Sequence, residues 1–353
     1  MTKSHDLSDE PKLLSAFVLL FMCITANAYD VMVDSVYYNL NLTDQTATVA
    51  DPSTENVTAY YKGKVVVPAS FTYKGRTFTV VGVADKAFSG SDSLTSVTLP
   101  NTIKDLPSNV FQYCSLLTDV DLPDSLTKIP SGCFFYCKSL EKVSIPDSVT
   151  VIDDYAFCGC SSFGPEFTVR SNMTLLGDQA LGGCPKLKRV IIEDSENSLR
   201  TGWWPLSGDI LDYLYVGRPF DTSTSADSIK VLELGAGLKT NAFPRDNNFT
   251  TIISDIEDPT LFDPEFTNAT YLNVPLYVPV GKVDAYRQAN GWKNFFDIRE
   301  NHGEVNKIDN VTAAKKAGVT MYYNLSGQAV AKDYKGVVIE RYSDGTSKKV
   351  LNK

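Results

Sequence analysis

The stretch NVFQYCSLLTDVDLPDS, residues 109–125, returns with small changes as GCFFYCKSLEKVSIPDS at residues 132–148. When the two are aligned, aromatic lies on aromatic, cysteine on cysteine, leucine on leucine and proline on proline. Three more windows share this pattern, and they begin at Lys86, Tyr155 and Gln179. A fixed period between about 20 and 50 residues is the signature of a solenoid built from stacked repeats.

Three columns of large apolar side chains run through the five windows. The first column contains Phe88, Phe111, Phe134, Phe157 and Leu181, with steps of 23, 23, 23 and 24 residues. The other two contain Leu94, Leu117, Leu140, Phe163 and Leu187, and Leu99, Leu122, Ile145, Val169 and Ile192. One repeat of this length cannot enclose a core alone, so each repeat should bury its apolar face against the next. The sequence therefore predicts a β-rich solenoid with repeats of about 23 residues.

A column of cysteines follows the aromatic column at a distance of three residues. Its members are Cys114, Cys137, Cys160 and Cys184, and Ser91 occupies the same place in the first window. A free cysteine packs as a small apolar residue, which favours a ladder of buried thiols. Disulfides between repeats are an alternative, whereas a metal site is disfavoured because ligands on successive repeats do not converge on one tetrahedral centre. The pattern assigns no partner to Cys133 or Cys158.

Composition argues against several classes of function. Asp and Glu outnumber Lys and Arg by 42 to 33, and a net charge of −9 disfavours a nucleic-acid partner. The two histidines, His5 and His302, cannot supply a catalytic triad within the repeats, and the sequence has no phosphate-binding glycine motif. The carboxylates near Asp153 and Glu193 are typical of solvated turns rather than of a glycosidase pair. We therefore expect no catalytic residues, no cofactor and no metal.

The order of segments predicts an exported protein in several parts. Residues 13–28, LLSAFVLLFMCITANA, are too short to span a bilayer and end in a small-x-small pattern, so residues 1–28 are interpreted as a signal peptide. No other segment could span a membrane. The signal peptide predicts that the mature chain is secreted or lies at the cell surface. The remaining boundaries are predicted as an N-terminal β cap at 29–79, a solenoid with a C-terminal cap at 80–300, a linker at 301–318 and a small β module at 319–353.

The repeat SLTSVTLPNTIKDLPSNVFQYC, residues 93–114, resembles the BspA-like leucine-rich repeats of secreted and surface proteins of the Bacteroidetes type. The ending LYVPVGKVDAYRQANGWKNF, residues 276–295, is typical of the same family. The resemblance implies a leucine-rich-repeat solenoid with a β-sheet on its concave side. The tail, which includes YYNLSGQAV at 322–330, resembles short C-terminal β modules, some of which are sorting signals for type IX secretion.

Two sets of residues are candidates for binding. The outward-facing strand positions are Ser96, Thr98, Asp119, Asp121, Lys142, Ser144, Arg189 and Ile191. The adjacent Trp203 and Trp204 could stack on a sugar ring or on a partner's side chain, or fill the core where the repeat breaks. From these we select as candidate binding residues Asp119, Asp121, Lys142, Ser144, Arg189, Trp203 and Trp204.

These patterns favour a non-enzymatic, adhesin-like binding protein. It would present one face of the solenoid to a host or microbial surface protein, or to a glycan such as mucin. The alternative is a structural or accessory component of a surface glycan-handling complex. An enzyme with an unrecognised site is the least favoured hypothesis.

Overall fold

The computed structural model describes residues 29–53, 60–219, 226–238 and 248–303, together with the backbone of four strands between residues 319 and 352. The predicted signal peptide lies outside the described residues, as does most of the predicted linker. The chain divides into two compact units, residues 1–299 and 300–353. Each is considered by itself.

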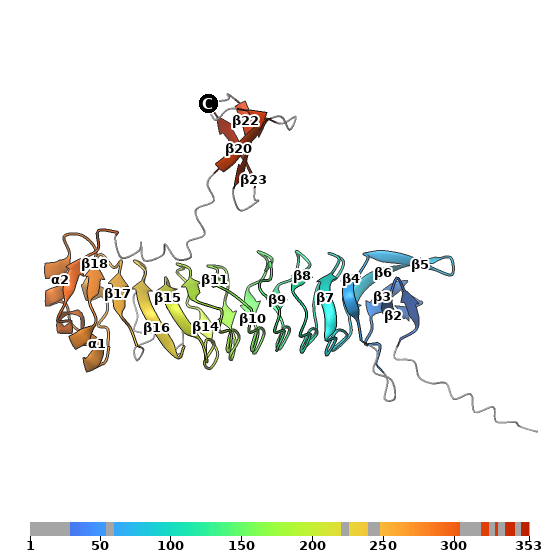
Figure 1. Cartoon of the computed structure of the whole chain (residues 1–353), viewed down its shortest axis with the longest axis horizontal. Helices are drawn as coiled ribbons and strands as arrows, with labels where there is room; N and C mark the ends of the chain where they lie inside the picture. The colour runs from blue at the N-terminus through green and yellow to red at the C-terminus, as the bar shows by residue number, and fades with distance from the viewer. Residues whose placement is uncertain are drawn as a thin grey trace, which may run out of the picture. The chain divides into compact units, whose positions relative to one another are not determined.

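The first unit is built around parallel strands that successive repeats contribute, although not every repeat contributes one. Three of them form one sheet: β4 (Lys62–Val66), β7 (Ser93–Thr98) and β8 (Asp119–Asp121). Seven more form a second sheet in the order β11 (Glu166–Val169), β13 (Arg189–Ile192), β15 (Ile210–Val216), β16 (Ser228–Leu234), β17 (Thr251–Ser254), β18 (Leu276–Val278) and β19 (Ile298–Glu300). Figure 1 shows these strands following one another along the unit. The fold is thus β-rich and of the leucine-rich-repeat type, and its expected curvature stays a prediction.

A second, narrower sheet forms another side of the coil. Its strands are β9 (Lys128–Ile129), β10 (Val151–Ile152), β12 (Leu175–Leu176) and β14 (Arg200–Thr201), and all are parallel. In each strand the second residue is buried and the first is not. This alternation follows from the two-residue period of strands, which turns neighbouring side chains to opposite faces.

Turns connect these sides, and they too are stacked through backbone hydrogen bonds. The N–H groups of Asn109, Phe111 and Tyr113 donate to carbonyls one repeat later, at 2.9, 3.0 and 2.7 Å. This third ladder satisfies backbone groups that would otherwise be left unpaired by the turns. Each turn therefore pairs with the equivalent turns of the neighbouring repeats, as the strands do.

The aromatic column forms the centre of the core. Phe88, Phe111, Phe134 and Phe157 are fully buried, and their ring centroids are separated by 5.1, 5.5 and 5.2 Å in sequence order. The thiols of Cys114, Cys137, Cys160 and Cys184 are buried beside them. Each thiol donates to the carbonyl of a column phenylalanine of the preceding repeat, at 3.0, 3.0, 3.0 and 3.3 Å. A thiol satisfies this carbonyl because it is both small and a weak donor.

A separate sheet precedes the repeats. It has the order β1-β2-β3-β6-β5, with β1 (Val31–Val33), β2 (Val36–Asn41), β3 (Thr46–Val49), β5 (Ser70–Tyr73) and β6 (Arg76–Val83). It joins the solenoid core through Tyr61, whose ring lies 4.6 Å from that of Phe88. Strand β4 lies inside the predicted cap at 29–79 but pairs in parallel with β7, so it supplies the first strand of the solenoid sheet.

The opposite end of the first unit contains its short helices. They are η1 (Pro259–Leu261), α1 (Asn268–Asn273), α2 (Val283–Gln288) and η2 (Trp292–Asn294). Trp292 is fully buried, with its ring 5.0 Å from that of Tyr286. The second unit is an antiparallel sheet of β20 (Val319–Asn324), β21 (Ala329–Val330), β22 (Gly336–Tyr342) and β23 (Ser347–Asn352), in the order β21-β20-β22-β23.

Candidate functional site

The row of main strands is interrupted between β8 and β11. The sequence predicts a strand in every repeat, but Lys142–Ile145, at the strand position of the third window, does not form one. Within the described part of the chain, the N–H groups of this segment donate to no backbone carbonyl. The expectation of a strand here is therefore wrong.

An extra residue in the next repeat accounts for the interruption. Two residues lie between Leu140 and Val143, whereas three lie between Phe163 and the equivalent Phe167. Pro165, in the lengthened stretch, has no N–H to donate. The Pro165 carbonyl accepts hydrogen bonds from the N–H groups of Lys188 and Arg189, at 2.7 and 3.0 Å, and so faces β13. Strand β11 thus pairs with β13 and leaves Lys142–Ile145 without a partner on that side.

Two contacts hold the ends of the gap together. At one end the Gly164 N–H donates to the Glu141 carbonyl at 3.1 Å. At the other end the Arg170 guanidinium donates to the carbonyls of Ile145 and Pro146, at 3.2 and 2.7 Å. These two contacts close the ends of the space between Lys142–Ile145 and β11, and the space opens on the outer face of the strands.

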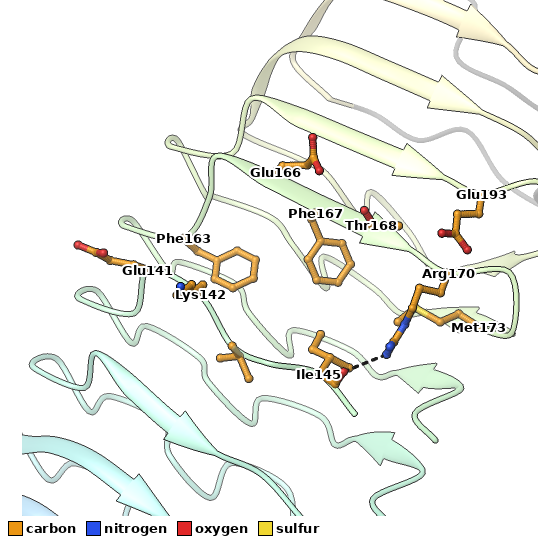
Figure 2. A pocket seen from close by; sticks show the side chains of 11 residues that line it. Glu141, Lys142, Ile145, Phe163, Glu166, Phe167, Thr168, Arg170, Met173 and Glu193 are labelled. Atoms are coloured by element: carbon orange, nitrogen blue, oxygen red, sulfur yellow. Dashed lines mark hydrogen bonds between the residues drawn. The ribbon is translucent and has the colours of Figure 1, made fainter. Parts of the chain in front are cut away.

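This space is a cleft of about 290 Å³ with an apolar floor. Figure 2 shows the rings of Phe163 and Phe167 side by side between β11 and the segment that carries Ile145. Val143 and Met173 complete the floor. The polar residues that line the cleft are Glu141, Lys142, Glu166, Thr168, Arg170 and Glu193.

Most charges around the cleft are already paired. Arg170 forms an ion pair with Asp147, and Arg189 Nε lies 3.0 Å from Glu166 Oε2. A carboxylate oxygen of Glu193 accepts the Ser171 N–H at 2.8 Å. Lys142 and Glu141, by contrast, are exposed and form no ion pair with any described residue. These two side chains are available to an incoming partner.

A hydrogen-bonded network continues along the same face from β13 to β17. The Arg189 guanidinium lies 3.9 Å from the centre of the Tyr213 ring, and the Tyr213 hydroxyl donates to Glu233 at 2.7 Å. Burial, together with the neighbouring Asp255, raises the pKa of Glu233 to about 7. Burial also raises the pKa of Asp255. This pair therefore holds a proton in mildly acidic solution, which avoids two adjacent buried charges.

The structure divides the predicted binding residues between two sides of the coil. Asp119 and Asp121 are exposed on β8, and Lys142 and Ser144 are exposed on the interrupted segment. The half-buried Arg189 lies on β13, next to the cleft through its contact with Glu166. Of these strand-face residues, Lys142 lines the cleft and Arg189 contacts the lining residue Glu166, whereas Asp119, Asp121 and Ser144 are not part of its lining.

Trp203 and Trp204 lie elsewhere, on the turn side. They are 70% and 52% exposed, so neither fills the core, and that interpretation is wrong. The Trp203 carbonyl accepts the Gln179 N–H at 3.0 Å, within the ladder of stacked turns. Their rings are 6.3 Å apart and nearly perpendicular.

Sequence reasoning did not find the floor of the cleft. The repeat pattern places Phe163 in an apolar core column and gives no reason to single out Phe167. The signal that could have revealed them is the change in step from 23 to 24 residues, because an inserted residue next to a proline disturbs the pairing of strands.

Residues 82–204 match the BspA type leucine rich repeat region, in six copies. A leucine-rich repeat protein from Bacteroides ovatus is 20% identical over 78% of this chain and 68% of its own, with a TM-score of 0.48. A leucine-rich repeat protein from Bacteroides capillosus is 31% identical over 34% of this chain and 83% of its own, with a TM-score of 0.29. A leucine rich cell surface protein from Faecalibacterium prausnitzii is 16% identical over 78% of this chain and 96% of its own, with a TM-score of 0.25. No curated protein matches the chain.

The stacked parallel strands and the repeated apolar columns define a leucine-rich-repeat solenoid. The matched repeats identify it further: the chain belongs to the BspA-type leucine-rich-repeat family. Among the helices of the described residues, none has the length and apolar character needed to cross a bilayer.

Proposed function

We propose that this protein is a secreted or cell-surface binding protein that holds a partner protein on its strand face. The observation that carries the proposal is the break in the sheet at Lys142–Ile145, which leaves an apolar-floored cleft of about 290 Å³. The proposal that the protein is exported rests on the predicted signal peptide at residues 1–28 and on the family resemblance. In this view the sheet of β1, β2, β3, β5 and β6 and the helices after β17 are caps that cover the ends of the solenoid.

The shape of the cleft favours one bulky apolar side chain of the partner. Its volume lies at the lower limit of the roughly 300–1,000 Å³ found for pockets that hold drug-sized ligands. Because contacts from Gly164 and Arg170 close both ends, an inserted strand would not fit. Large side chains that enter such desolvated pockets contribute most of the binding free energy at protein interfaces.

The polar surroundings favour binding over catalysis. Glu166 and Glu193 are engaged by Arg189 and by the Ser171 N–H, which fixes them as acceptors. The exposed Lys142 and Glu141 flank the cleft with opposite charges. Such a rim selects the orientation of a partner more than it adds affinity.

The test blocks the cleft without disturbing the core. Thr168, on β11, is half-buried and lines the cleft. Its side chain lies on the opposite face of the strand from the buried Phe167 and Val169. We expect Thr168→Phe to fill the cleft and to weaken binding at least about tenfold, since a lost anchor contact typically exceeds about 1.4 kcal/mol. The measurement is biolayer interferometry against immobilised extracellular-matrix proteins and mucin.

A matched control exists in the first repeat. Thr98 on β7 is also half-buried and also precedes a residue of the third apolar column, but β7 is paired on both sides. Thr98→Phe should leave binding unchanged. The cleft assignment fails if a folded Thr168→Phe protein binds as the parent does, and the adhesin-like role fails if no protein of the panel binds.

A further inference from the structure

An exposed cluster of aromatic rings lies on the turn side of the solenoid. It consists of Tyr113, Phe135, Tyr136 and Tyr155, and we call it the aromatic turn patch. The three tyrosines are 50%, 42% and 39% exposed. Phe135 lies at the centre, with ring centroids 5.6, 4.6 and 6.3 Å from those of Tyr113, Tyr136 and Tyr155. The patch therefore presents a continuous aromatic surface across three repeats.

These tyrosines occupy backbone positions that favour glycine. Tyr113, Tyr136 and Tyr155 have φ of +61°, +57° and +57°. The position of Tyr113 and Tyr136 is taken by Gly159 in the next repeat, and Gly132 takes the position of Tyr155 one repeat earlier. A bulky side chain at positive φ costs free energy that glycine avoids. The fold does not require aromatic residues here, and strain held at an exposed surface points to a function.

A pocket of about 220 Å³ adjoins the patch. Its lining consists of Asn109, Gln112, Ser131, Gly132, Phe135 and Tyr155. Gly132 creates part of the space, because a Cβ there would lie 2.1 Å from Asn109 Oδ1. The side-chain amides of Asn109 and Gln112 form no hydrogen bond with any described residue. The lining combines aromatic faces with free donors and acceptors and contains no acidic or basic side chain.

We propose that the aromatic turn patch and its pocket bind an uncharged oligosaccharide. A pyranose ring has an apolar face that can stack on the rings of Phe135 and Tyr155, and hydroxyl groups at its edge that match the amides of Asn109 and Gln112. The pocket is smaller than those of drug-sized ligands and accommodates one ring, while Tyr113 and Tyr136 continue the surface for neighbouring sugar units. A neutral lining disfavours phosphorylated, sulfated or sialylated ligands, which select Arg or Lys partners.

The proposed sugar site is independent of the protein-binding cleft, because the two linings have no residue in common. Trp204 extends the aromatic character of the turn side, since it is 52% exposed and has φ of +54° in the same turn position as Tyr155. The turn side therefore carries exposed tyrosines and tryptophans at recurring turn positions.

The test measures binding of the full chain to neutral oligosaccharides by isothermal titration calorimetry. The probes are cellohexaose, laminarihexaose, mannohexaose, xylohexaose and neutral O-glycans released from mucin. We expect at least one to bind with a dissociation constant below about 1 mM. Tyr155→Gly and Tyr113→Gly should each weaken that binding at least about tenfold without lowering the melting temperature, because glycine suits their positive φ.

Lys86→Gly is the matched control. Lys86 has φ of +57° at the same turn position as Tyr155 but lies outside the patch, so the change should preserve sugar binding. The proposal is overturned if none of the probes binds, or if binding survives both tyrosine changes. It is also overturned if sialylated or sulfated glycans bind at least tenfold more tightly than neutral ones. Binding of a deglycosylated protein that Tyr155→Gly abolishes, without binding of any sugar, would assign the patch to a protein partner instead.

Discussion

Asp209 is a buried acid with an incomplete set of partners. Its Oδ1 accepts the Cys184 N–H at 2.7 Å, whereas its Oδ2 is buried without a hydrogen-bond partner. Burial raises the pKa of Asp209 to about 7; the Asp227 carboxylate acts in the same direction and Lys188 opposes it. An unpaired charge in this place would be costly, so the carboxyl group stays protonated in mildly acidic solution.

The shifted pKa makes stability depend on pH. Folded Asp209 keeps its proton up to about pH 7, whereas the unfolded chain releases it near pH 3.8. The folded state thus binds more protons in this window, and the free energy of unfolding falls as pH rises through it, by up to about 1.4 kcal/mol per pH unit. Glu233, with a pKa of about 7, acts in the same direction.

Asp209→Asn should remove the first of these contributions. The asparagine Oδ1 can still accept the Cys184 N–H, but it never becomes charged. We expect the variant to be more stable than the parent at pH 8, by about 1–3 kcal/mol, and to show a shallower decline between pH 4 and 7. Urea unfolding at several pH values measures this. An unchanged slope in Asp209→Asn would contradict the prediction.

At the scale of single elements, the interrupted segment differs from every paired strand around it. Lys142–Ile145 has the alternating pattern of a strand, yet its N–H groups donate to no backbone carbonyl in the described structure. Local stability follows from such bonds and from burial, and Val143 and Ile145 are only half-buried. The segment therefore lies at the low end of the stability of the solenoid.

Hydrogen exchange should reveal this difference directly. We expect peptides that cover Lys142–Ile145 to exchange their amide protons at least about tenfold faster than peptides that cover β13, where the residues pair on both sides. Mass spectrometry of the native protein provides the measurement. Equal protection in the two peptides would show that the sheet is continuous and that the cleft is not formed.

At the scale of the whole first unit, the phenylalanine column couples one repeat to the next. Phe134 is fully buried between Phe111 and Phe157, with ring centroids 5.5 and 5.2 Å away. In a solenoid, stability is approximately the sum of each repeat and its contacts with its neighbours. A cavity in the middle of the column therefore weakens two interfaces at once.

Phe134→Ala should lower the free energy of unfolding by roughly 3–5 kcal/mol. Because the cavity separates the repeats before it from those after it, the denaturant transition should also broaden or divide in two. Circular dichroism and tryptophan fluorescence followed together would detect this, since Trp292 reports on the far end. A loss below about 0.5 kcal/mol, the usual range of surface changes, would mean that the column is not the core.

The sequence alone determined the solenoid and its apolar columns. A period of 23 residues repeats the same apolar positions, and stacked repeats are the arrangement that buries all of them. It also identified Asp119 and Asp121 as exposed positions of a strand, because side chains alternate along a strand. These features depend on a local pattern that recurs from repeat to repeat, so they would be recognisable even if one repeat were missing.

Only the tertiary structure decided where the repeats fail to pair and which rings gather on the turn side. The change of step at Phe163–Phe167 is visible in the sequence, but the cleft forms because Pro165 turns its carbonyl toward β13 while Arg170 spans the gap. The aromatic turn patch arises from Tyr113 and Tyr155, which are distant in the sequence and meet through Phe135. A pattern within one repeat cannot reveal such contacts, because they depend on the offset between neighbouring repeats and on backbone angles that the stacked turns impose.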